Sequence, residues 1–207
     1  MTEGRHESKT KLLEAALYVI RARGYTATRV EDVCATAGVT KGSFFHHFKS
    51  KEELALEAAA FWDERASELF KAAPYHELPT ARGRLLAYVD MRKALLQGEL
   101  PEFTCLMGTM AQEVYKTEPA ILEACARGIE GHARTLEADI AEAMRDSGLQ
   151  ADWSASSLAL HTQAVIQGAF ILAKAQDGAQ VAVDSLNHLR RYLELLFVPA
   201  ADAARAA

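Results

Sequence analysis

The chain has 207 residues, half of them apolar and a quarter charged, and its formal net charge is -5. This length suffices for a substantial hydrophobic core, and no uninterrupted apolar run reaches the length of roughly eighteen residues that a membrane span needs. Residues 1–50 hold eight Lys or Arg against five Asp or Glu, while the other residues hold 15 against 23. Because local positive charge favours phosphates, this asymmetry predicts a polyanion partner at one end only.

The first two expected helices are marked by caps and a glycine. Ser8 can cap a first helix, which Gly24 ends. The series Thr28-Arg29-Val30-Glu31 has the form of a capping box, in which a hydroxyl and a carboxylate satisfy each other's backbone amides. It predicts a second helix over 29–37.

A third and a fourth helix follow at once. Gly38 supplies a left-handed turn, and Thr40 can cap a short helix that ends at His47. A second capping box, Ser50-Lys51-Glu52-Glu53, opens a long helix that ends before Pro74. Three short helices and one long one are therefore expected in this part of the chain.

Five further helices are expected, over 80–97, 101–115, 119–147, 154–176 and 180–197. Prolines and glycines punctuate their ends. No segment has the pattern of a strand, so the sequence predicts an all-α chain of nine helices.

The second and third helices, joined by a short glycine-containing turn, have the form of a helix-turn-helix, whose second helix enters the major groove of DNA. The third helix is too short to be stable alone, so Phe44 and Phe48 must anchor it, against Val30, Val33 and Ala37. Its other face carries Thr40, Lys41, Ser43, Phe45, His46 and His47. Hydroxyls, an ammonium and imidazoles suit phosphates or base edges, and an aromatic edge suits a thymine methyl.

The series from Thr26 to Leu54 resembles the N-terminal DNA-binding domain of TetR-family transcriptional regulators. The family hallmarks are Gly24, Gly38, Val39, Lys41, Gly42, His47, Phe48, Lys51 and Leu54. The resemblance covers roughly the first 55 residues, and beyond them only the number and lengths of the helices agree. It implies a nine-helix homodimer with a DNA-binding domain over 1–50 and an effector-binding and dimerisation domain over 51–207. Such a dimer binds a palindromic double-stranded operator and releases it when a small molecule occupies the C-terminal domain.

The resemblance also implies roles for single residues. Thr40, Phe45, His47 and Lys51 match positions that contact the DNA backbone, and Lys41, Gly42, Ser43 and His46 match positions that meet bases or allow close approach. Arg29 completes the predicted DNA-binding set. Family members often have Tyr where this chain has Phe45, so a hydroxyl bond to phosphate is lost. His46 occupies a variable position, which is where operator specificity usually lies.

The predicted effector-binding residues are aromatic, sulfur-containing or imidazole side chains: Trp62, Tyr88, Phe103, Cys105, Met107, Met110, Tyr115 and His132. A pocket for an apolar or aromatic effector and an ordinary core both fit this composition, and His132 and His161 suit a satisfied core position as well as a ligand. Cys105 follows Pro101 closely, so it is either a redox or electrophile sensor at a helix start or a buried, inert thiol.

The last two expected helices carry apolar stripes that are wider than one partner helix needs. The predicted dimer interface consists of Leu158, Val165, Ala169, Leu172, Leu186, Leu189 and Leu193. Two such helices could pair with their symmetry mates in a four-helix interface, and packing inside the subunit explains part of the stripe.

Other classes of site have little support. His46 and His47 are adjacent and diverge by about 100° on a helix, which does not suit a metal pair. Three distant cysteines, Cys34, Cys105 and Cys125, suggest neither a disulfide framework nor a zinc knuckle, and no catalytic or cofactor motif is present. We expect no enzyme and no cofactor. MTEGRHESK lacks the apolar core of a signal peptide, so a cytoplasmic location is expected. A helix-turn-helix that contacts protein and a helical enzyme remain alternatives, and repression is not separated from activation.

Overall fold

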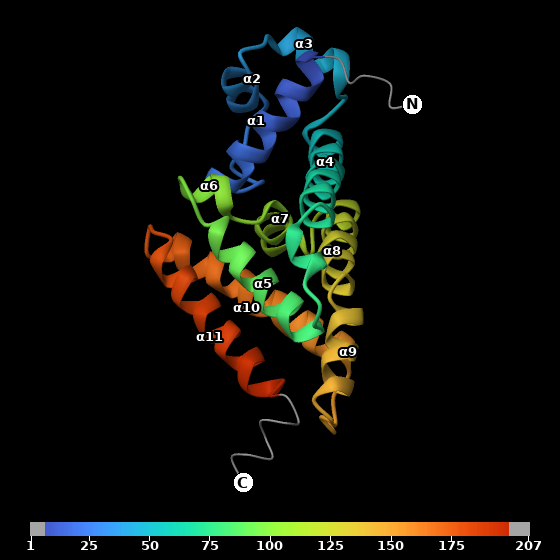
Figure 1. Ribbon diagram of the computed structural model, residues 1–207. Helices are drawn as coiled ribbons and strands as arrows, with labels where there is room; N and C mark the ends of the chain where they lie inside the picture. Colours follow the sequence, from blue (N-terminus) through green and yellow to red (C-terminus); the bar gives the residue numbers. More distant parts are fainter. Residues whose placement is uncertain (1–6, 199–207) are drawn as a thin grey trace. The chain divides into compact units, whose positions relative to one another are not determined.

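The computed structural model describes residues 7–198, in which every regular element is a helix (Figure 1). The first elements are α1 (Glu7–Arg23), α2 (Val30–Ala37), α3 (Lys41–His47) and α4 (Lys51–Lys71). A 3-10 turn, η1 (Pro74–Glu77), then precedes α5 (Ala81–Ala94), α6 (Leu100–Phe103), α7 (Leu106–Val114) and α8 (Pro119–Arg134). The chain continues with α9 (Glu137–Asp146), α10 (Ala155–Ala175) and α11 (Gln180–Leu196).

The chain forms two compact units that are interleaved in sequence. Of the described residues, 7–70 and 99–129 make unit 1, and 71–98 and 130–198 make unit 2. The sequence predicts a division at residue 50 between two domains with different functions. How the chain packs into compact units does not test a division by function. That division therefore stays a prediction.

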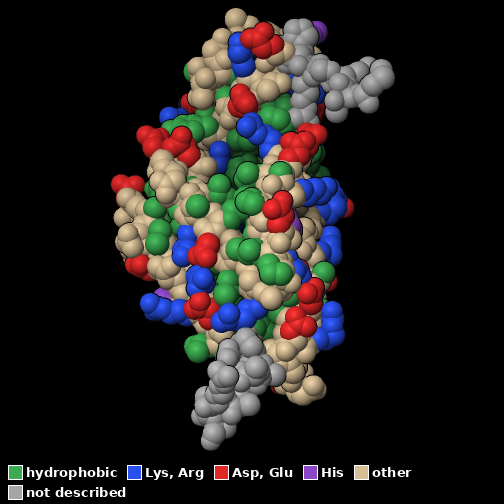
Figure 2. Space-filling model, in the orientation of Figure 1, with side chains coloured by type: hydrophobic (Ala, Val, Ile, Leu, Met, Phe, Trp, Pro, Cys, Tyr) green, Lys and Arg blue, Asp and Glu red, His purple; other side chains and the backbone are tan. Residues whose placement is uncertain are grey.

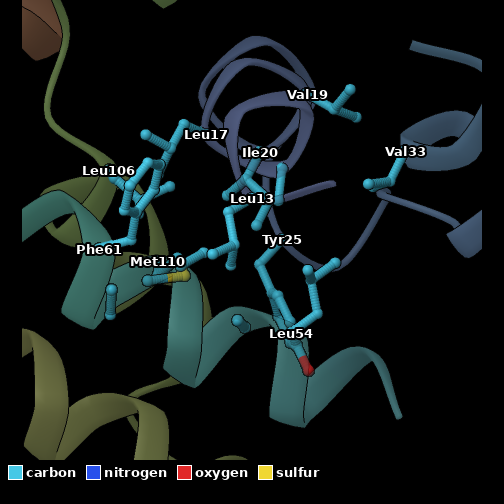
Figure 3. Packing of buried hydrophobic residues seen from close by; sticks show 14 of the residues in the cluster. Leu13, Leu17, Val19, Ile20, Tyr25, Val33, Leu54, Phe61, Leu106 and Met110 are labelled. Atoms are coloured by element: carbon cyan, nitrogen blue, oxygen red, sulfur yellow. The ribbon is translucent and has the colours of Figure 1, made fainter. Parts of the chain in front are cut away.

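Unit 1 has a core to which α1, α2, α3, α4, α7 and α8 all contribute. Figure 3 shows Leu13 and Ile20 of α1 directed towards α4, with Tyr25 beside Leu54 and with Val33 of α2 at one end of the cluster. Buried residues from α7 and α8 belong to the same cluster. The helix-turn-helix therefore shares one core with the middle of the chain.

Unit 2 is built on α5, α10 and α11, which lie side by side in Figure 1. Arg190 of α11 pairs with Asp90 of α5, at 3.0 Å between Nε and Oδ2. Arg84 of α5 donates to both Asp139 and Glu142 of α9, at 2.7 Å each. On the face drawn in Figure 2, basic and acidic side chains accordingly lie next to one another and do not form separate patches.

By length and composition, α10 is the single helix within residues 7–198 that could cross a membrane, which the expectation from apolar runs did not anticipate. The core helix of a globular protein passes the same test. Here α10 packs along α11 and buries two polar side chains, Thr162 and Gln163, inside unit 2. These contacts are those of a core helix.

Two of the expected helices are each divided, so the described chain has eleven α-helices and not nine. The helix expected over 101–115 breaks at Thr104, whose hydroxyl donates to the carbonyl oxygen of Leu100 at 2.7 Å. The helix expected over 119–147 breaks after Arg134, where Thr135 donates to the carbonyl of His132 at 2.7 Å. Both breaks lie at a threonine whose hydroxyl bonds to a nearby carbonyl, and at the first of them the backbone of Thr104 is extended and the Cys105 sulfur caps the next helix.

The start of α2 differs from the predicted capping box. The Thr28 hydroxyl donates to the Gly24 carbonyl at 2.6 Å and so does not cap α2. The residue that bonds back to the chain is Asp32, whose carboxylate accepts from the Arg29 amide at 3.1 Å, and not Glu31. The box is shifted by one residue because the Thr28 side chain is buried in the preceding turn.

The other predicted caps have mixed outcomes. Thr40 and Ser50 cap as expected, since their hydroxyls accept from the amides of Ser43 at 3.2 Å and Glu53 at 3.0 Å. Ser8 lies within α1, and its hydroxyl shares a hydrogen bond with the side chain of His47. It therefore ties α1 to α3 and does not cap a helix.

Candidate nucleic-acid interface

The seven-residue helix α3 is fixed by its buried side. Phe44 and Phe48 are 0% and 1% exposed, and their ring centroids lie 5.5 Å apart. The Thr40 hydroxyl caps the helix by accepting from the Ser43 amide. A helix this short gains most of its stability from packing, so these contacts determine where its other face points.

The outer side of α3 is a polar and aromatic surface formed by Lys41, Gly42, Phe45 and His46, which we call the reading face. Phe45 is 59% exposed although it is aromatic. A Cβ at Gly42 would make only an ordinary contact, 3.7 Å from the Thr40 hydroxyl, so packing within the described chain does not require glycine there. A glycine on such a face allows another molecule to approach the backbone closely.

Lys41 and His47 are both engaged within the chain. Lys41 pairs with Glu31, and both side chains are more than half exposed, so this pair can exchange for a pair with a phosphate. His47 is half-buried, and its Nε2 lies 2.7 Å from the hydroxyl of Ser8. Lys41 thus lies on the open surface, whereas His47 serves to hold α3 against α1.

The side chain of Lys51, the first residue of α4, contacts the turn between α1 and α2 and is not part of the reading face. Its ammonium donates to the carbonyl oxygens of Tyr25, Thr26 and Thr28 at 3.1, 3.4 and 3.2 Å. It also lies 4.4 Å from the centroid of the Tyr25 ring. An ammonium has three protons, and three carbonyl oxygens of this turn lie within its reach. Arg29 is exposed at the start of α2.

Sequence reasoning missed Glu113 of α7, which holds the same turn from its amide side. Its carboxylate accepts from the Tyr25 amide at 3.2 Å and from the Thr26 amide at 2.8 Å. These partners lie 88 and 87 residues away in the sequence, so no local pattern indicates the contact. The available signal was Gly24, which has a positive φ of 85° at that turn.

The predicted effector-binding residues are divided between the two units. Unit 1 contains Trp62, Phe103, Cys105, Met107, Met110 and Tyr115, and unit 2 contains Tyr88 and His132. Met107 and Met110 belong to the core cluster, and a Cβ at Gly128 would lie 2.1 Å from the Met107 sulfur. This close packing favours the plain core interpretation for the two methionines. Tyr115, by contrast, is 59% exposed.

The three cysteines are free thiols with different surroundings. Burial raises the pKa of Cys125 to about 12, and it also raises the pKa of Cys34, so both stay protonated near neutral pH. Cys105 is half-buried and caps α7, with its sulfur accepting from the Gly108 amide at 3.4 Å. The sensor interpretation of Cys105 stays untested by this geometry.

In unit 2, Tyr88 and His132 belong to a buried polar cluster. The Tyr88 oxygen accepts from Arg92 Nε at 3.0 Å and from Gln163 Nε2 at 3.1 Å, and it lies 2.9 Å from His132 Nε2. Since Arg92 and Gln163 can only donate here, the single hydroxyl proton goes to His132. Burial, and then the charge of Arg92, lowers the pKa of His132 to about 3. His132 is therefore neutral, with its proton on Nδ1.

Most of the predicted dimer residues are buried within the chain itself, and the dimer interface stays a prediction. Leu158, Ala169, Leu186, Leu189 and Leu193 are at most 4% exposed, and Val165 is partly buried. Leu172 is the exception, at 45% exposed. The exposed large apolar side chains of these helices are Leu160, Ile171, Leu172, Tyr192 and Leu195, a set that we call the α10–α11 apolar face. Helical periodicity located the stripe but not the element that covers it.

In the described part of the chain, no group of three or more His, Cys, Asp or Glu side chains could hold a metal ion. The rings of His46 and His47 make an edge contact, with centroids 4.8 Å apart.

An all-α chain with a short, firmly anchored helix and an exposed basic and aromatic face defines a helix-turn-helix DNA-binding protein.

Comparison with known proteins agrees with this class. The family described as bacterial regulatory proteins of the tetR family matches residues 12–58. The tetracyclin repressor-like C-terminal domain matches residues 81–189, which is more than half of the chain. The chain therefore belongs to the TetR family of transcriptional regulators.

Individual relatives are more distant. The HTH-type transcriptional repressor KstR2 of Rhodococcus jostii (strain RHA1) is 28% identical over 131 residues, which are 55% of this chain and 64%, less than two thirds, of that relative. The regulatory protein TetR from Rhodobacter sphaeroides has a TM-score of 0.80 at 24% identity, over 93% of this chain and 100% of its own. A cysteine mutant of the regulator CifR, solved with 26bp double-strand operator DNA, has a TM-score of 0.72 at 20% identity, over 88% and 95%. The two structures show a shared fold.

The low pKa of His132 predicts a pH-dependent stability. As the pH falls below 6.5, the unfolded chain binds a proton at His132 that the folded chain does not bind until about pH 3. The free energy of unfolding should therefore fall by about 1–2 kcal/mol more between pH 7 and pH 5 than in a His132→Gln variant. Urea denaturation measures this difference. His188→Gln, at an exposed histidine, is the control and should keep the full decrease, whereas equal slopes in all three proteins contradict the prediction.

The surroundings of the two lysines predict opposite phenotypes. Lys41→Ala should leave the melting temperature unchanged and reduce the salt dependence of DNA binding by about one, because an exposed phosphate contact is lost. Lys51→Ala should lower the free energy of unfolding by about 1 kcal/mol or more, because three turn carbonyls lose their donor. Thermal melts and anisotropy titrations at several salt concentrations measure both. A Lys51→Ala protein with native stability and a reduced salt slope would instead support the phosphate contact implied by the family resemblance.

Proposed function

We propose that this protein is a ligand-responsive repressor that binds a palindromic operator as a homodimer, inserts α3 into the major groove and is released by a small effector. The observation that carries the proposal is the reading face, where Lys41, Gly42, Phe45 and His46 are exposed on a helix that Phe44 anchors from behind. Repression, in preference to activation, is supported by the relative KstR2, which is a transcriptional repressor. A cytoplasmic location follows from this role.

Roles on and around the reading face follow from exposure. Lys41 is assigned to phosphates or purine edges, His46 to base edges and Phe45 to a thymine methyl. Gly42 and Ser43 allow the backbone of α3 to approach the groove. Thr40, His47 and Lys51 act mainly by fixing α3 and the turn, as their intrachain bonds suggest. Arg29, which is exposed at the start of α2, is assigned to the DNA backbone.

The dimer is assigned to the α10–α11 apolar face. Two half-sites of a palindrome require two reading faces related by a twofold axis. Leu160, Ile171 and Leu172 of α10 are each at least 45% exposed, and Tyr192 and Leu195 of α11 continue the apolar surface. A Cβ at Gly168, between them on α10, would meet nothing within 4 Å, which leaves room for a symmetry-related helix.

A small apolar or aromatic effector is proposed to bind in the region matched by the C-terminal family domain. Tyr88 and His132 are two predicted effector residues that contact each other, and they supply buried polar groups beside Arg92 and Gln163. Such a group can orient a mostly apolar ligand. Native mass spectrometry of the purified chain tests for a bound compound, and a compound whose removal leaves operator affinity unchanged contradicts effector-controlled release.

His46 should carry operator discrimination. His46→Ala is expected to weaken binding to an operator selected from random-sequence DNA by roughly 1–3 kcal/mol, because base-edge contacts are lost. Binding to scrambled DNA should barely change, since phosphates supply that affinity. Anisotropy titrations against both duplexes measure the difference. Equal losses on the two duplexes exclude base reading by His46, and no loss for either His46→Ala or Lys41→Ala excludes α3 as the reading helix.

Leu172 should separate the dimer from the subunit core. Leu172→Glu places a charge on the exposed α10–α11 apolar face, so the subunit should stay folded while the dimer dissociates and operator affinity collapses. Leu189→Glu, at a position that is 3% exposed, should instead unfold the subunit. Sedimentation velocity and circular dichroism distinguish the two outcomes. A fully dimeric Leu172→Glu protein rejects this face as the interface.

A further inference from the structure

The turn between α1 and α2 is held from two sides by opposite charges that come from distant helices. The Lys51 ammonium of α4 donates to the carbonyl oxygens of Tyr25, Thr26 and Thr28. The Glu113 carboxylate of α7 accepts from the amides of Tyr25 and Thr26. Backbone groups outside helices need such partners, and bonds to charged groups are stronger than neutral ones. Both the amide and the carbonyl groups of the turn are thereby held by charged side chains.

The shape of the turn is adapted to the carboxylate. Gly24 has a φ of 85°, in the region that favours glycine. A Cβ there would lie 2.1 Å from the Glu113 Oε1, so the carboxylate oxygen occupies the space that any other side chain would fill. The Gly24 side of the turn is also closed by the Thr28 hydroxyl, which donates to the Gly24 carbonyl at 2.6 Å. Glycine is thus needed here for two separate reasons.

The same segment of the chain contacts α1 as well. Arg21 of α1 donates to the carbonyl oxygens of Glu102 and Thr104, at 3.1 and 3.3 Å, just before α7 begins. Its guanidinium lies 4.7 Å from the centroid of the Trp62 ring of α4. The end of α1 and the turn that follows it are therefore both attached to the α6–α7 segment. Because α2 starts at Val30, directly after this turn, these contacts set the direction in which α2 and α3 leave α1.

We propose that Glu113 is a positioning residue for operator recognition: by holding the amides of Tyr25 and Thr26, it fixes the orientation of α2 and α3 for the groove. The inference rests on the proposed role of α3 as the reading helix. It makes the Glu113 carboxylate a point at which the rest of the chain can adjust DNA affinity, since a rotation of this side chain releases the turn while the buried residues of α7 stay in the core. Glu113 itself contacts no DNA in this proposal.

The test replaces the carboxylate in the full-length protein by Glu113→Gln and Glu113→Ala. Operator affinity should fall by about tenfold for Ala and less for Gln, which keeps one acceptor oxygen. Affinity for scrambled DNA should not fall, because the lost charge is negative and its removal favours a polyanion. The amide exchange rates of Tyr25 and Thr26, measured by NMR, should rise while the melting temperature stays near the native value.

Glu123→Gln is the matched control, because it removes the same charge from an exposed carboxylate that pairs with Arg127 on α8. It should leave operator affinity and both amide exchange rates unchanged. The inference is overturned if the Glu113 variants bind operator like Glu123→Gln, or if their loss of affinity follows a general loss of stability and amide protection throughout unit 1. His46→Ala distinguishes a failure of the positioning role from a failure of the proposed function. If the Glu113 variants bind operator normally while His46→Ala loses discrimination, only the positioning role of Glu113 is rejected. If the Glu113 variants and His46→Ala all bind operator normally, the proposed function is rejected.

Discussion

The position of the reading face, which we propose to contact DNA, depends on the burial of two phenylalanine rings beneath a helix of seven residues. A helix of this length does not form alone, because nucleation costs more than a few hydrogen bonds return. Phe44 and Phe48 offset that cost, since a fully buried aromatic side chain contributes on the order of 2–3 kcal/mol. Being four residues apart, they take one side of α3 and leave Gly42, Phe45 and His46 on the other. Stability and recognition are thus divided between two faces of one short helix.

Features that depend on a few neighbouring residues were predictable from the sequence. The Thr40 cap joins residues three apart, and the left-handed Gly38 that ends α2 has a φ of 64°. Both signals act within one helical turn, and here no competing contact displaces them, unlike at Thr28 and Ser8. The break in the helix expected over 101–115 shows the limit of this reasoning, because periodicity alone would continue the helix past Thr104, where the backbone is extended.

Features that depend on which elements meet were not predictable. The phosphate contact that the family pattern implies for Lys51 stays a prediction, but that pattern did not indicate its partners within the chain, which are carbonyls 23 to 26 residues away. Leu186, Leu189 and Leu193 form a regular stripe, and the subunit itself covers it. A periodic pattern reports that a face is apolar, but the identity of the covering element is a property of the packed chain. Which apolar side chains of α10 and α11 stay exposed, such as Ile171 and Leu172, could be determined only once the buried contacts of these helices were known.

The contacts that fix the reading helix differ in how readily they can change. The Phe44 and Phe48 contacts are apolar and buried, so moving them costs cavity and transfer energy together. The bonds from Glu113 to Tyr25 and Thr26 are charge-assisted but lie near solvent, where water can replace them at small cost. They also join residues 12–58, which the family's DNA-binding domain matches, to residues 81–189, which its C-terminal domain matches. Within unit 1 the two matched regions are therefore linked by hydrogen bonds from Glu113 that water can replace. The shape of the reading face is kept by the buried contacts of Phe44 and Phe48, which water cannot replace. A regulator needs this combination, because its affinity for DNA must change while its specificity stays the same.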